Sequence, residues 1–427
     1  MHHVILGAGP AGVIAAETLR KHAPADTITM VGDESEPPYS RMAIPYLLMG
    51  NVGERGTYLR KGLTHFDDLK IKMVHARASA LDSAAKTVTL DNGSTLSFDR
   101  LLIATGSHPI RPPIPGMDLP GIHPCWTMED ARAIQKLATK GARVLQMGAG
   151  FIGCIIMEAL AARGVKLSVV EMGDRMVPRM MGPTAGGMIK DWCAAKGVQV
   201  FTGTRVEAIE KGTGDAALKV KLSNGQSMDV DLVISATGVR PNIGFLENSG
   251  VKCLVGVLTD EHLQTNLPGI YAAGDCAEAF DKISGKTIVS AIQPNAAEQA
   301  RVAALNMVGQ AAELRGVTQI NVLDTLGLVS TSFGNWEGVP GGEHVELTDR
   351  GSDGGKGRHL SLQFGGSKLV GCNSIGWTEH VGVMRGLVEG EVKLTGDWKQ
   401  RLIADPTLLM QAYLACAQAQ QEMAHVG

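Results

Sequence analysis

Two glycine-rich segments of the sequence have the spacing of a turn that holds a phosphate group. They are Gly7-Ala8-Gly9-Pro10-Ala11-Gly12 and Gly148-Ala149-Gly150-Phe151-Ile152-Gly153. In this G-x-G-x-x-G pattern the first glycine makes a tight turn, the second lets the backbone approach a pyrophosphate, and the third lets a helix pack closely on a strand. The N-terminus of that helix adds backbone N–H groups and the positive end of its dipole. The spacing therefore predicts two sites for nucleotides that contain a pyrophosphate.

Each turn lies in the order strand, glycine turn, helix, strand and acidic residue, which is the context that a dinucleotide-binding unit requires. The first copy consists of the apolar run His3–Leu6, a helix to about Lys21, a strand at Thr27–Val31 and the acids Asp33 and Glu34. The second consists of Arg143–Met147, a helix to about Arg163, a strand at Lys166–Val170 and Glu171. Two copies in full context are much stronger evidence of nucleotide binding than one isolated pattern.

Three further segments predict buried strands that end in turns, and one predicts a helix. Arg100–Ala104 leads into Thr105-Gly106, and Asp231–Ala236 leads into Thr237-Gly238 in the same way. Ile270–Ala273 leads into Gly274-Asp275, whose single carboxylate can accept a hydroxyl of a ribityl chain. The helix is predicted at Pro294–Val308, and its N-terminus would be another source of positive dipole.

The composition excludes several classes of partner. The 427 residues have a formal net charge of −3, which favours neither a nucleic-acid backbone nor an anionic membrane. No stretch approaches 18 uninterrupted apolar residues, so we expect no membrane-spanning helix. The seven cysteines are scattered without a C-x-x-C pair, which predicts free thiols in the cytoplasm, no disulfide framework and no metal site within the chain.

Taken together, these motifs resemble the FAD/NAD(P)-linked reductases of the glutathione-reductase superfamily. The resemblance rests on both glycine turns, both Ala-Thr-Gly turns and the segment LPGIYAAGDCAE, and it covers essentially the whole chain. It implies an α/β fold with two Rossmann-like dinucleotide-binding domains, one inserted in the other, and a C-terminal α+β interface domain. The implied bounds are 1–112 and 246–317 for the FAD-binding domain, 113–245 for the NAD-binding domain and 318–427 for the interface domain.

The resemblance also implies which residues contact FAD and NAD(H). In the family the first turn holds FAD and the second holds NAD(P)H, while the Gly-Asp pair contacts the ribityl chain. The implied FAD contacts are Gly7, Gly9, Pro10, Ala11, Gly12, Asp33, Glu34, Arg41, Ala78, Ala104, Thr105, Gly106, Gly274 and Asp275, and the implied NAD(H) contacts are Gly148, Gly150, Phe151, Ile152, Gly153, Glu171 and Gly238. In the family's usual register Gly32 stands at the acid position of the first unit, so Asp33 and Glu34 both remain candidates for the adenosine ribose.

The segment after the first unit indicates the type of reductase. Related disulfide reductases carry a C-x-x-x-x-C pair there, and related NADH oxidases and peroxidases carry one redox cysteine near the position of Met42. This chain has no cysteine before Cys125, so a thiol mechanism is not expected. The pattern of Pro38, Tyr39 and Arg41 instead resembles rubredoxin reductases, ferredoxin reductases and the flavin module of nitrite reductases, in which Arg41 would contact a flavin phosphate.

Two positions of the second unit bear on the nicotinamide nucleotide. Glu171 can bond both hydroxyls of a ribose and would repel a 2′-phosphate, which favours NADH over NADPH. Family members commonly carry a glutamate where this chain has Ile155, and that glutamate helps to hold the nicotinamide; Glu158 is a possible substitute. Hydride transfer needs orientation and no side-chain acid or base, so we expect no catalytic side chain.

The predicted function is an oxidoreductase that exchanges a hydride between NAD(H) and FAD and exchanges single electrons with an iron–sulfur protein. Two short segments resemble NAD-linked flavoprotein subunits of phenylglyoxylate dehydrogenase and tungsten-containing aldehyde oxidoreductase, which favours a subunit of a larger complex. The alternatives are a free-standing ferredoxin or rubredoxin reductase, an NADH oxidase or quinone reductase, and a flavin-binding subunit that no longer reacts with nicotinamide. The protein could be a hetero-oligomer or a homodimer.

The C-terminal region carries no dinucleotide fingerprint. Its pattern predicts strands at Val322–Phe333, His359–Phe364 and Lys368–Cys372, followed by helices at His380–Leu387 and Pro406–Glu422. The polar segment Gly341–Gly357 between the first two strands predicts a loop.

Overall fold

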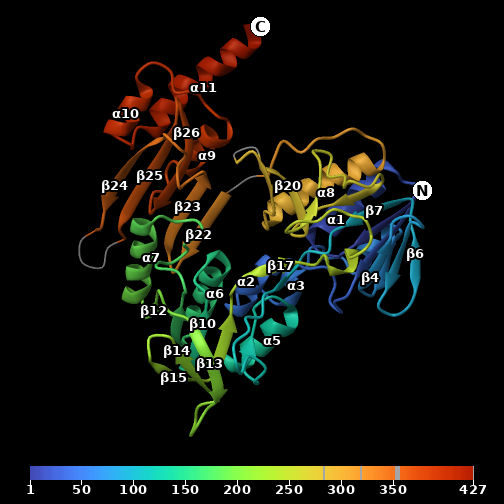
Figure 1. Ribbon diagram of the computed structural model, residues 1–427, viewed down its shortest axis with the longest axis horizontal. Helices are drawn as coiled ribbons and strands as arrows, with labels where there is room; N and C mark the ends of the chain where they lie inside the picture. The colour runs from blue at the N-terminus through green and yellow to red at the C-terminus, as the bar shows by residue number, and fades with distance from the viewer. Residues whose placement is uncertain (282–283, 318–319, 352–355, 427) are drawn as a thin grey trace. The chain divides into compact units, whose positions relative to one another are not determined.

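The computed structural model describes residues 1–281, 284–317, 320–351 and 356–426. They form two compact units (Figure 1). The first unit contains the described residues of Met1–Ile110, Trp126–Met128 and Val239–Thr318, and the second contains those of Arg111–Cys125, Glu129–Gly238 and Gln319–Gly427. The greater part of the second unit is thus inserted into the sequence of the first.

A five-stranded parallel sheet is the centre of the first unit. Its strand order is β19-β7-β1-β2-β3, and the strands are Ile270–Ala272, Arg100–Ile103, His2–Leu6, Thr27–Gly32 and Ile71–His75. Four of the five residues of β1 are buried, and three of them, Val4, Ile5 and Leu6, are apolar, as expected for a parallel strand covered on both faces. Helices α1 (Pro10–His22) and α8 (Gln293–Met307) pack against each other beside this sheet (Figure 1).

The remaining elements of the first unit are short. Two three-stranded sheets are formed by β4 (Ala78–Asp82), β5 (Thr87–Leu90) and β6 (Thr95–Ser97), and by β18 (Val257–Leu258), β20 (Ala277–Asp281) and β21 (Lys286–Ile288). Strands β8 (Ser107–Pro109) and β17 (Val239–Pro241) pair with each other. The short helices are η1 (Arg41–Ala43), α2 (Ile44–Leu48), α3 (Glu54–Thr57), α4 (His65–Asp68) and η2 (Gly244–Leu246).

The second unit is built on an equivalent parallel sheet with the order β12-β11-β10-β16-β9. Its strands are Gln199–Phe201, Lys166–Val170, Arg143–Met147, Leu232–Ser235 and Ile122–His123. The associated helices are α5 (Met128–Leu137), α6 (Phe151–Ala162) and α7 (Pro183–Ala195), and a three-stranded antiparallel sheet is formed by β13 (Val206–Lys211), β14 (Leu218–Leu222) and β15 (Ser227–Val230). The predicted α/β class with two Rossmann-like folds is therefore confirmed.

The C-terminal part belongs to the second unit. Its antiparallel sheet has the order β22-β23-β26-β25-β24, with strands Ile320–Thr325, Leu328–Gly334, Lys368–Ile375, Arg358–Gly365 and Glu343–Asp349, and it is accompanied by α9 (Val381–Glu389), α10 (Trp398–Ala404) and α11 (Leu409–Val426) (Figure 1). The indole N–H of Trp192, on α7, donates to the Thr325 carbonyl at 3.1 Å. Asn373, on β26, accepts the Gly182 N–H at 3.0 Å and donates to the Met180 carbonyl at 2.9 Å.

The prediction of a loop at Gly341–Gly357 is wrong over Glu343–Asp349, which forms β24; residues 352–355 lie outside the described part of the chain. The sequence did not predict this strand because it lacks apolar alternation. It lies at the edge of the sheet, and most of its side chains are exposed. The predicted strand at Val322–Phe333 is two strands, β22 and β23, joined by a turn at Leu326 and Gly327. Helix α10 was not predicted.

Candidate functional site

The first glycine turn joins β1 to α1, and its geometry explains why glycine occupies each of the three positions. Gly7 has a φ of +116°, and its N–H donates to the Val31 carbonyl at 2.7 Å. A Cβ on Gly7 would lie 2.0 Å from the Ala104 carbonyl oxygen, and a Cβ on Gly12 would lie 1.9 Å from the Gly7 carbonyl oxygen. A Cβ on Gly9 would meet nothing within 4 Å, so this position faces open space where a ligand can approach.

The second glycine turn joins β10 to α6 with the same backbone arrangement. Gly148 has a φ of +95°, and its N–H donates to the Val170 carbonyl at 2.8 Å. A Cβ on Gly148 would lie 2.3 Å from the Ala236 carbonyl oxygen, and a Cβ on Gly153 would lie 2.5 Å from that of Gly148. A Cβ on Gly150 would meet nothing within 4 Å. The predicted residues of each turn are therefore brought together at the end of their sheet.

The N-termini of α1 and α6 are capped by Gly9 and Gly150, and within the described part of the chain no side chain caps either helix. The first N–H groups of a helix have no acceptor within the helix itself. Pro10 begins α1, where its fixed φ suits the first helical position, and Ala11 follows it, almost fully buried. Phe151 and Ile152 begin α6. Both helix starts can therefore accept an anion.

The acidic residues at the two turns differ. Leu6 pairs with Val31 and Met147 pairs with Val170, so the residue after this equivalent pair is Gly32 in the first unit and Glu171 in the second. The carboxylate of Glu171 accepts the Ala149 N–H at 2.7 Å and the Gly173 N–H at 2.8 Å. Glu171 therefore holds the loop at the second turn, whereas Gly32 has no side chain with which to do so.

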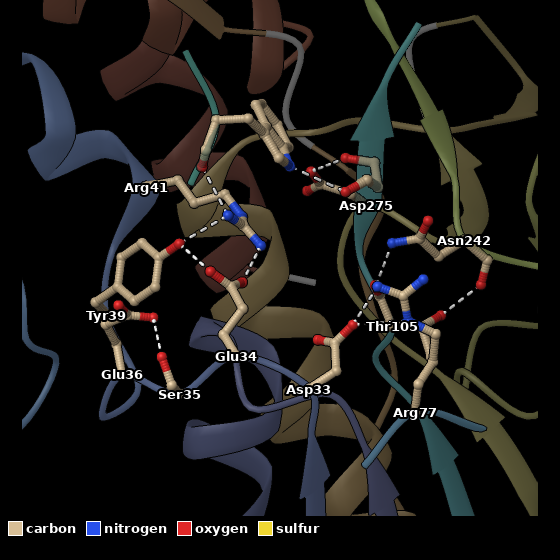
Figure 2. A network of polar contacts seen from close by, with 12 residues as sticks. Asp33, Glu34, Ser35, Glu36, Tyr39, Arg41, Arg77, Thr105, Asn242 and Asp275 are labelled. Atoms are coloured by element: carbon tan, nitrogen blue, oxygen red, sulfur yellow. Dashed lines mark hydrogen bonds and ion pairs between the residues drawn. The ribbon is translucent and has the colours of Figure 1, made fainter. Parts of the chain in front are cut away.

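The two acids that follow Gly32 are engaged elsewhere (Figure 2). Asp33 accepts a hydrogen bond from Arg77 Nε at 2.7 Å, and both side chains are well exposed. Glu34 forms an ion pair with Arg41 at 2.5 Å and accepts the hydroxyl of Tyr39. The structure thus leaves the choice between Asp33 and Glu34 as ribose ligand open.

Arg41 is the centre of a polar network in the first unit (Figure 2). Besides Glu34, its guanidinium donates to the Tyr39 hydroxyl at 2.9 Å and to the Trp126 carbonyl at 2.6 Å. It also lies over the Tyr39 ring and the Trp126 ring, at 5.5 and 5.3 Å from their centroids. Burial raises the pKa of Tyr39, so its hydroxyl remains a donor to Glu34. These contacts fix a cation that an anionic ligand can use.

Asp275 is a half-buried acid that follows β19, where the sequence predicts it. Its carboxylate accepts the Ser107 hydroxyl at 2.8 Å, and burial raises the pKa of Asp275 (Figure 2). The preceding Gly274 has a φ of +81°, and its N–H donates to Gln299 Oε1 at 2.8 Å. A half-buried carboxylate that accepts the Ser107 hydroxyl has further acceptor capacity, which suits a ligand hydroxyl.

The Ala-Thr-Gly turns lie beside the glycine turns of their own units. Ala104 is buried, and Thr105 donates its hydroxyl to the Asn242 carbonyl at 2.7 Å while its carbonyl accepts Asn242 Nδ2 at 2.8 Å. The N–H of Asn242 donates to the Gly106 carbonyl at 2.9 Å. In the second unit Gly238 has a φ of +108°. Sequence reasoning missed Asn242, because its role depends on the pairing of β8 with β17.

A cavity of about 310 Å³ lies next to the first turn, and part of its wall was not predicted. Ala8, Gly32 and Glu34 line one side of it. The residues that sequence reasoning missed come from α4, the loop before it and β3, and include Leu63, Phe66 and Met73. Leu63 is 73% exposed and Met73 is 40% exposed, so this wall presents apolar surface to solvent. A flat apolar ring such as adenine would bury that surface.

Three other candidate positions are placed as follows. Ala78 begins β4 and packs against the buried core of the first unit, away from the residues that line the cavity. Ile155 lies half-buried on α6. Glu158, one turn further along α6, is also half-buried, and burial together with the nearby charge of Asp324 raises its pKa. A carboxyl group with a raised pKa beside a second acid is poorly suited to replace the missing glutamate.

The cysteines are free, and most are buried. Burial raises the pKa of Cys125 and of Cys193 to about 12, and it also raises that of Cys154, Cys276 and Cys372. Thiols in this state are protonated near neutral pH and are poor nucleophiles.

Two absences apply to the described residues. No helix there has the length and apolar character to cross a bilayer. No group of three or more His, Cys, Asp and Glu side chains there is arranged to hold a metal ion.

Comparison with known proteins shows the family to which the chain belongs. The sequence pattern of the pyridine nucleotide-disulphide oxidoreductase family matches residues 1–304. An NADH oxidase of Methanocaldococcus jannaschii is 31% identical over 88% of each chain. The epsilon subunit of an NADH-dependent phenylglyoxylate dehydrogenase of Aromatoleum evansii is 30% identical over 95% of each chain. The crystal structure of the ferredoxin reductase for the CYP199A2 system of Rhodopseudomonas palustris has a TM-score of 0.82 and 25% identity, covering 92% of this chain and 96% of that one. The resemblance predicted from the motifs is confirmed.

Proposed function

Because the chain belongs to the pyridine nucleotide-disulphide oxidoreductase family and is an NAD(H)-dependent FAD oxidoreductase, we propose that its electron partner is a separate iron–sulfur protein. The finer proposal is that the chain is the NAD-linked flavoprotein subunit of a larger oxidoreductase. The observation that carries it is the match to the phenylglyoxylate dehydrogenase epsilon subunit over 95% of both chains. The similarity to a ferredoxin reductase over 92% of this chain supports the same class of partner.

The state of the cysteines supports this choice over a thiol mechanism. A disulfide reductase relays electrons through a thiolate close to its flavin. In this chain the first cysteine in the sequence is Cys125, and burial raises its pKa to about 12. Cys276 follows Asp275 directly, yet it is fully buried and its pKa is also raised. Electron transfer from the flavin directly to an outside acceptor is the simpler route.

We assign FAD to the first turn, and the residues there fit it. Gly9 leaves the space that a pyrophosphate needs, and the helix start of α1 supplies N–H groups. The half-buried carboxylate of Asp275 can accept a ribityl hydroxyl. The cavity beside Ala8 and Gly32 has an apolar wall for adenine. When bound, FAD supplies a ring that can take up two electrons as a hydride and release them singly. The proposed FAD-binding domain comprises residues 1–112 and 246–317.

Arg41 and α8 have supporting roles in the same proposal. Arg41 contacts two aromatic rings and has Glu34 as counter-ion, so its guanidinium is held in place to contact a phosphate oxygen. Ser40, the residue before it, donates its hydroxyl to Gln293 at the start of α8 at 2.6 Å. This bond ties the Arg41 segment to a helix N-terminus whose dipole favours negative charge on a bound ring.

We assign NAD(H) to the second turn, within the domain bounds 113–245. Gly150 leaves open space at the start of α6. Glu171 follows β11, at the position from which an acid bonds the ribose hydroxyls in a dinucleotide-binding unit. Two backbone N–H groups already hold its side chain in place, and a carboxylate at this position would repel a 2′-phosphate. NADH is therefore the proposed substrate rather than NADPH.

A second candidate function has its own support. The NADH oxidase of Methanocaldococcus jannaschii is 31% identical over 88% of each chain, so oxygen is an alternative acceptor. An oxidase would sustain NADH turnover with oxygen alone. An electron-transfer subunit would oxidise NADH slowly under oxygen and quickly when its iron–sulfur partner is present.

The test is purification of the tagged chain from its native cells without oxygen, in a cytoplasmic fraction where we expect it. The proposal predicts a companion that contains iron and sulfide and whose clusters NADH reduces only while the flavoprotein is present. The chain purified alone, with oxygen consumption that matches NADH consumption at a steady rate, would instead establish an oxidase. The same preparation gives the oligomeric state by light scattering.

A further inference from the structure

A buried glutamine lies directly beneath the second glycine turn. Gln146 is on β10, two residues before Gly148, and its side chain is 0% exposed. It pairs with Val169 and Ile234 on the neighbouring strands, so it is surrounded by a buried parallel sheet. An amide in such a place is unfavourable unless its donors and acceptor are all bonded.

The amide group of Gln146 joins two of the three fingerprint glycines. Nε2 donates to the Gly148 carbonyl at 2.9 Å and to the Gly153 carbonyl at 2.9 Å. Both neighbours are acceptors, so the NH2 group must face them and the orientation of the amide is fixed. The other atom, Oε1, is buried without a hydrogen-bond partner among the described residues. As a contribution to stability this is a poor choice of side chain, because a half-satisfied buried amide is worse than an apolar group.

The first turn does without this glutamine. Ile5 stands at the equivalent place, two residues before Gly7, and its Cγ2 would lie 3.4 Å from a Cβ placed on Gly12. The two turns nevertheless have the same backbone hydrogen bond from their first glycine, at 2.7 Å in the first and 2.8 Å in the second. An apolar residue is therefore sufficient to form the turn.

The peptide unit that joins Gly148 to Ala149 is held at both of its polar ends. Gln146 holds its carbonyl at 2.9 Å, and Glu171 holds its N–H at 2.7 Å. In the first unit the residues at these two places are Ile5 and Gly32, and neither can form such a bond. Both differences thus act on one peptide unit, which leads directly into Gly150, the position of the turn that leaves open space for a pyrophosphate.

We propose that Gln146 is a positioning residue for the nicotinamide dinucleotide. A ribose diol that bonds to Glu171 competes with the Ala149 N–H for the same carboxylate. Gln146 keeps the peptide from rotating when that happens, so the turn stays in the geometry that binds pyrophosphate. The inference rests on the proposed assignment of NAD(H) to the second turn.

The test is the affinity of the FAD-loaded protein for NAD⁺, which does not react with oxidised flavin and can be followed by calorimetry. The expected result for Gln146→Ile is a dissociation constant for NAD⁺ raised about tenfold, an effect of the size of one neutral hydrogen bond, because the Gly148–Ala149 peptide is no longer held when a ribose competes for Glu171. Its FAD content should stay unchanged, and its melting temperature should stay the same or rise because the unsatisfied Oε1 is gone. Gln146→Met is a second variant of similar length, and Ile5→Val is the matched control in the first turn, expected to bind NAD⁺ normally.

A double-mutant cycle with Glu171→Gln gives the sharper readout. If Gln146 acts by holding the peptide that Glu171 also holds, the effects of the two substitutions on NAD⁺ affinity should not add. Normal NAD⁺ affinity in both Gln146 variants would overturn the inference, and so would a weaker affinity that always accompanies a lower melting temperature. Gly150→Ala distinguishes failure of the Gln146 inference from failure of the proposed function. If this variant also keeps normal NAD⁺ affinity, the assignment of NAD(H) to the second turn is wrong, and not only the role of Gln146.

Discussion

The two glycine turns have the same backbone arrangement but different side chains around it. Each begins with a glycine of positive φ whose N–H bonds to the neighbouring strand, and each ends in a helix capped by glycine. The second turn adds Glu171 and Gln146 where the first has Gly32 and Ile5. The glycines therefore account for the shape of a dinucleotide turn, while the residues around it decide what holds the ligand and how firmly the turn itself is held.

The two turns also differ in how closely the helix approaches. A Cβ on Gly12 would lie 1.9 Å from the carbonyl beneath it, whereas a Cβ on Gly153 would lie 2.5 Å from its counterpart. Both distances are far below any real contact, so neither position accepts alanine without backbone movement. The first turn is the tighter of the two, and we expect it to be the less tolerant.

The largest effect is expected for Gly12→Ala. The new methyl group collides with the Gly7 carbonyl, and overpacking against a backbone atom costs about 3 kcal/mol or more. The variant should lose most of its FAD and melt at a lower temperature, as measured by the flavin-to-protein absorbance ratio and by calorimetry. Gly9→Ala is the matched control, since its methyl group meets nothing within 4 Å. It should fold normally and lose FAD only. A Gly12→Ala protein with full FAD content would show that the turn is not as tight as described.

A smaller effect, confined to the second turn, is expected for Glu171→Ala. The carboxylate bonds two backbone N–H groups, and hydrogen bonds to a charged group contribute about 1.5–3 kcal/mol each. We expect NAD⁺ to bind about 10- to 100-fold more weakly, with FAD content unchanged. Asp33→Ala, a change one residue beyond the equivalent position Gly32 in the first unit, should weaken FAD binding less than Glu171→Ala weakens NAD⁺ binding, because the Asp33 carboxylate is paired with Arg77 near solvent. If Asp33→Ala weakened FAD binding as much as Glu171→Ala weakens NAD⁺ binding, the proposed difference between the two turns would be contradicted.

Arg41→Ala tests a contact that only the first unit has. It removes the ion pair with Glu34 and the bonds to Tyr39 and Trp126, and with them the cation proposed to meet a flavin phosphate. FAD affinity should fall about tenfold, measured by fluorescence as FAD is titrated into apoprotein. NAD⁺ affinity should not change. Arg41→Lys should recover only part of the loss, because lysine lacks the planar fork that bonds three partners.

The smallest effect is expected for His3→Val, a change that copies Val144 from the same place in the second sheet. His3 is fully buried, and burial lowers its pKa below the ordinary value of 6.5. The unfolded chain therefore takes up a proton below about pH 6.5 that the folded chain does not, so the folded protein loses stability as the pH falls. Between pH 6.5 and 5 the loss is at most about 2 kcal/mol. Denaturant unfolding should show this slope in the wild type and a flatter one in His3→Val, and parallel slopes would contradict it.

The sequence allowed the turns and their flanking elements to be predicted closely, since glycine spacing and continuous apolar runs are local signals. The strand predicted at Lys166–Val170 is β11 with the same bounds, and the helix predicted from Pro294 begins one residue earlier. The role of Gln146 was not predictable, because it depends on two carbonyls that the turn brings back over the strand. The apolar wall of the cavity was not predictable for a similar reason. It consists of Leu63, Phe66 and Met73, and only folding places their loop, α4 and β3 beside the first turn.

The anaerobic titration of FAD-loaded protein with NADH tests the central claim, that the first turn holds FAD and the second holds NAD(H). Flavin absorbance should bleach at stoichiometric NADH in the wild type, while NADPH should be much less effective. Gly150→Ala should keep its FAD and need far more NADH, whereas Gly9→Ala should lose FAD yet show normal NADH affinity in the fraction that remains loaded. Bleaching of Gly150→Ala at stoichiometric NADH would contradict the claim, as would a wild-type flavin that dithionite reduces and NADH does not.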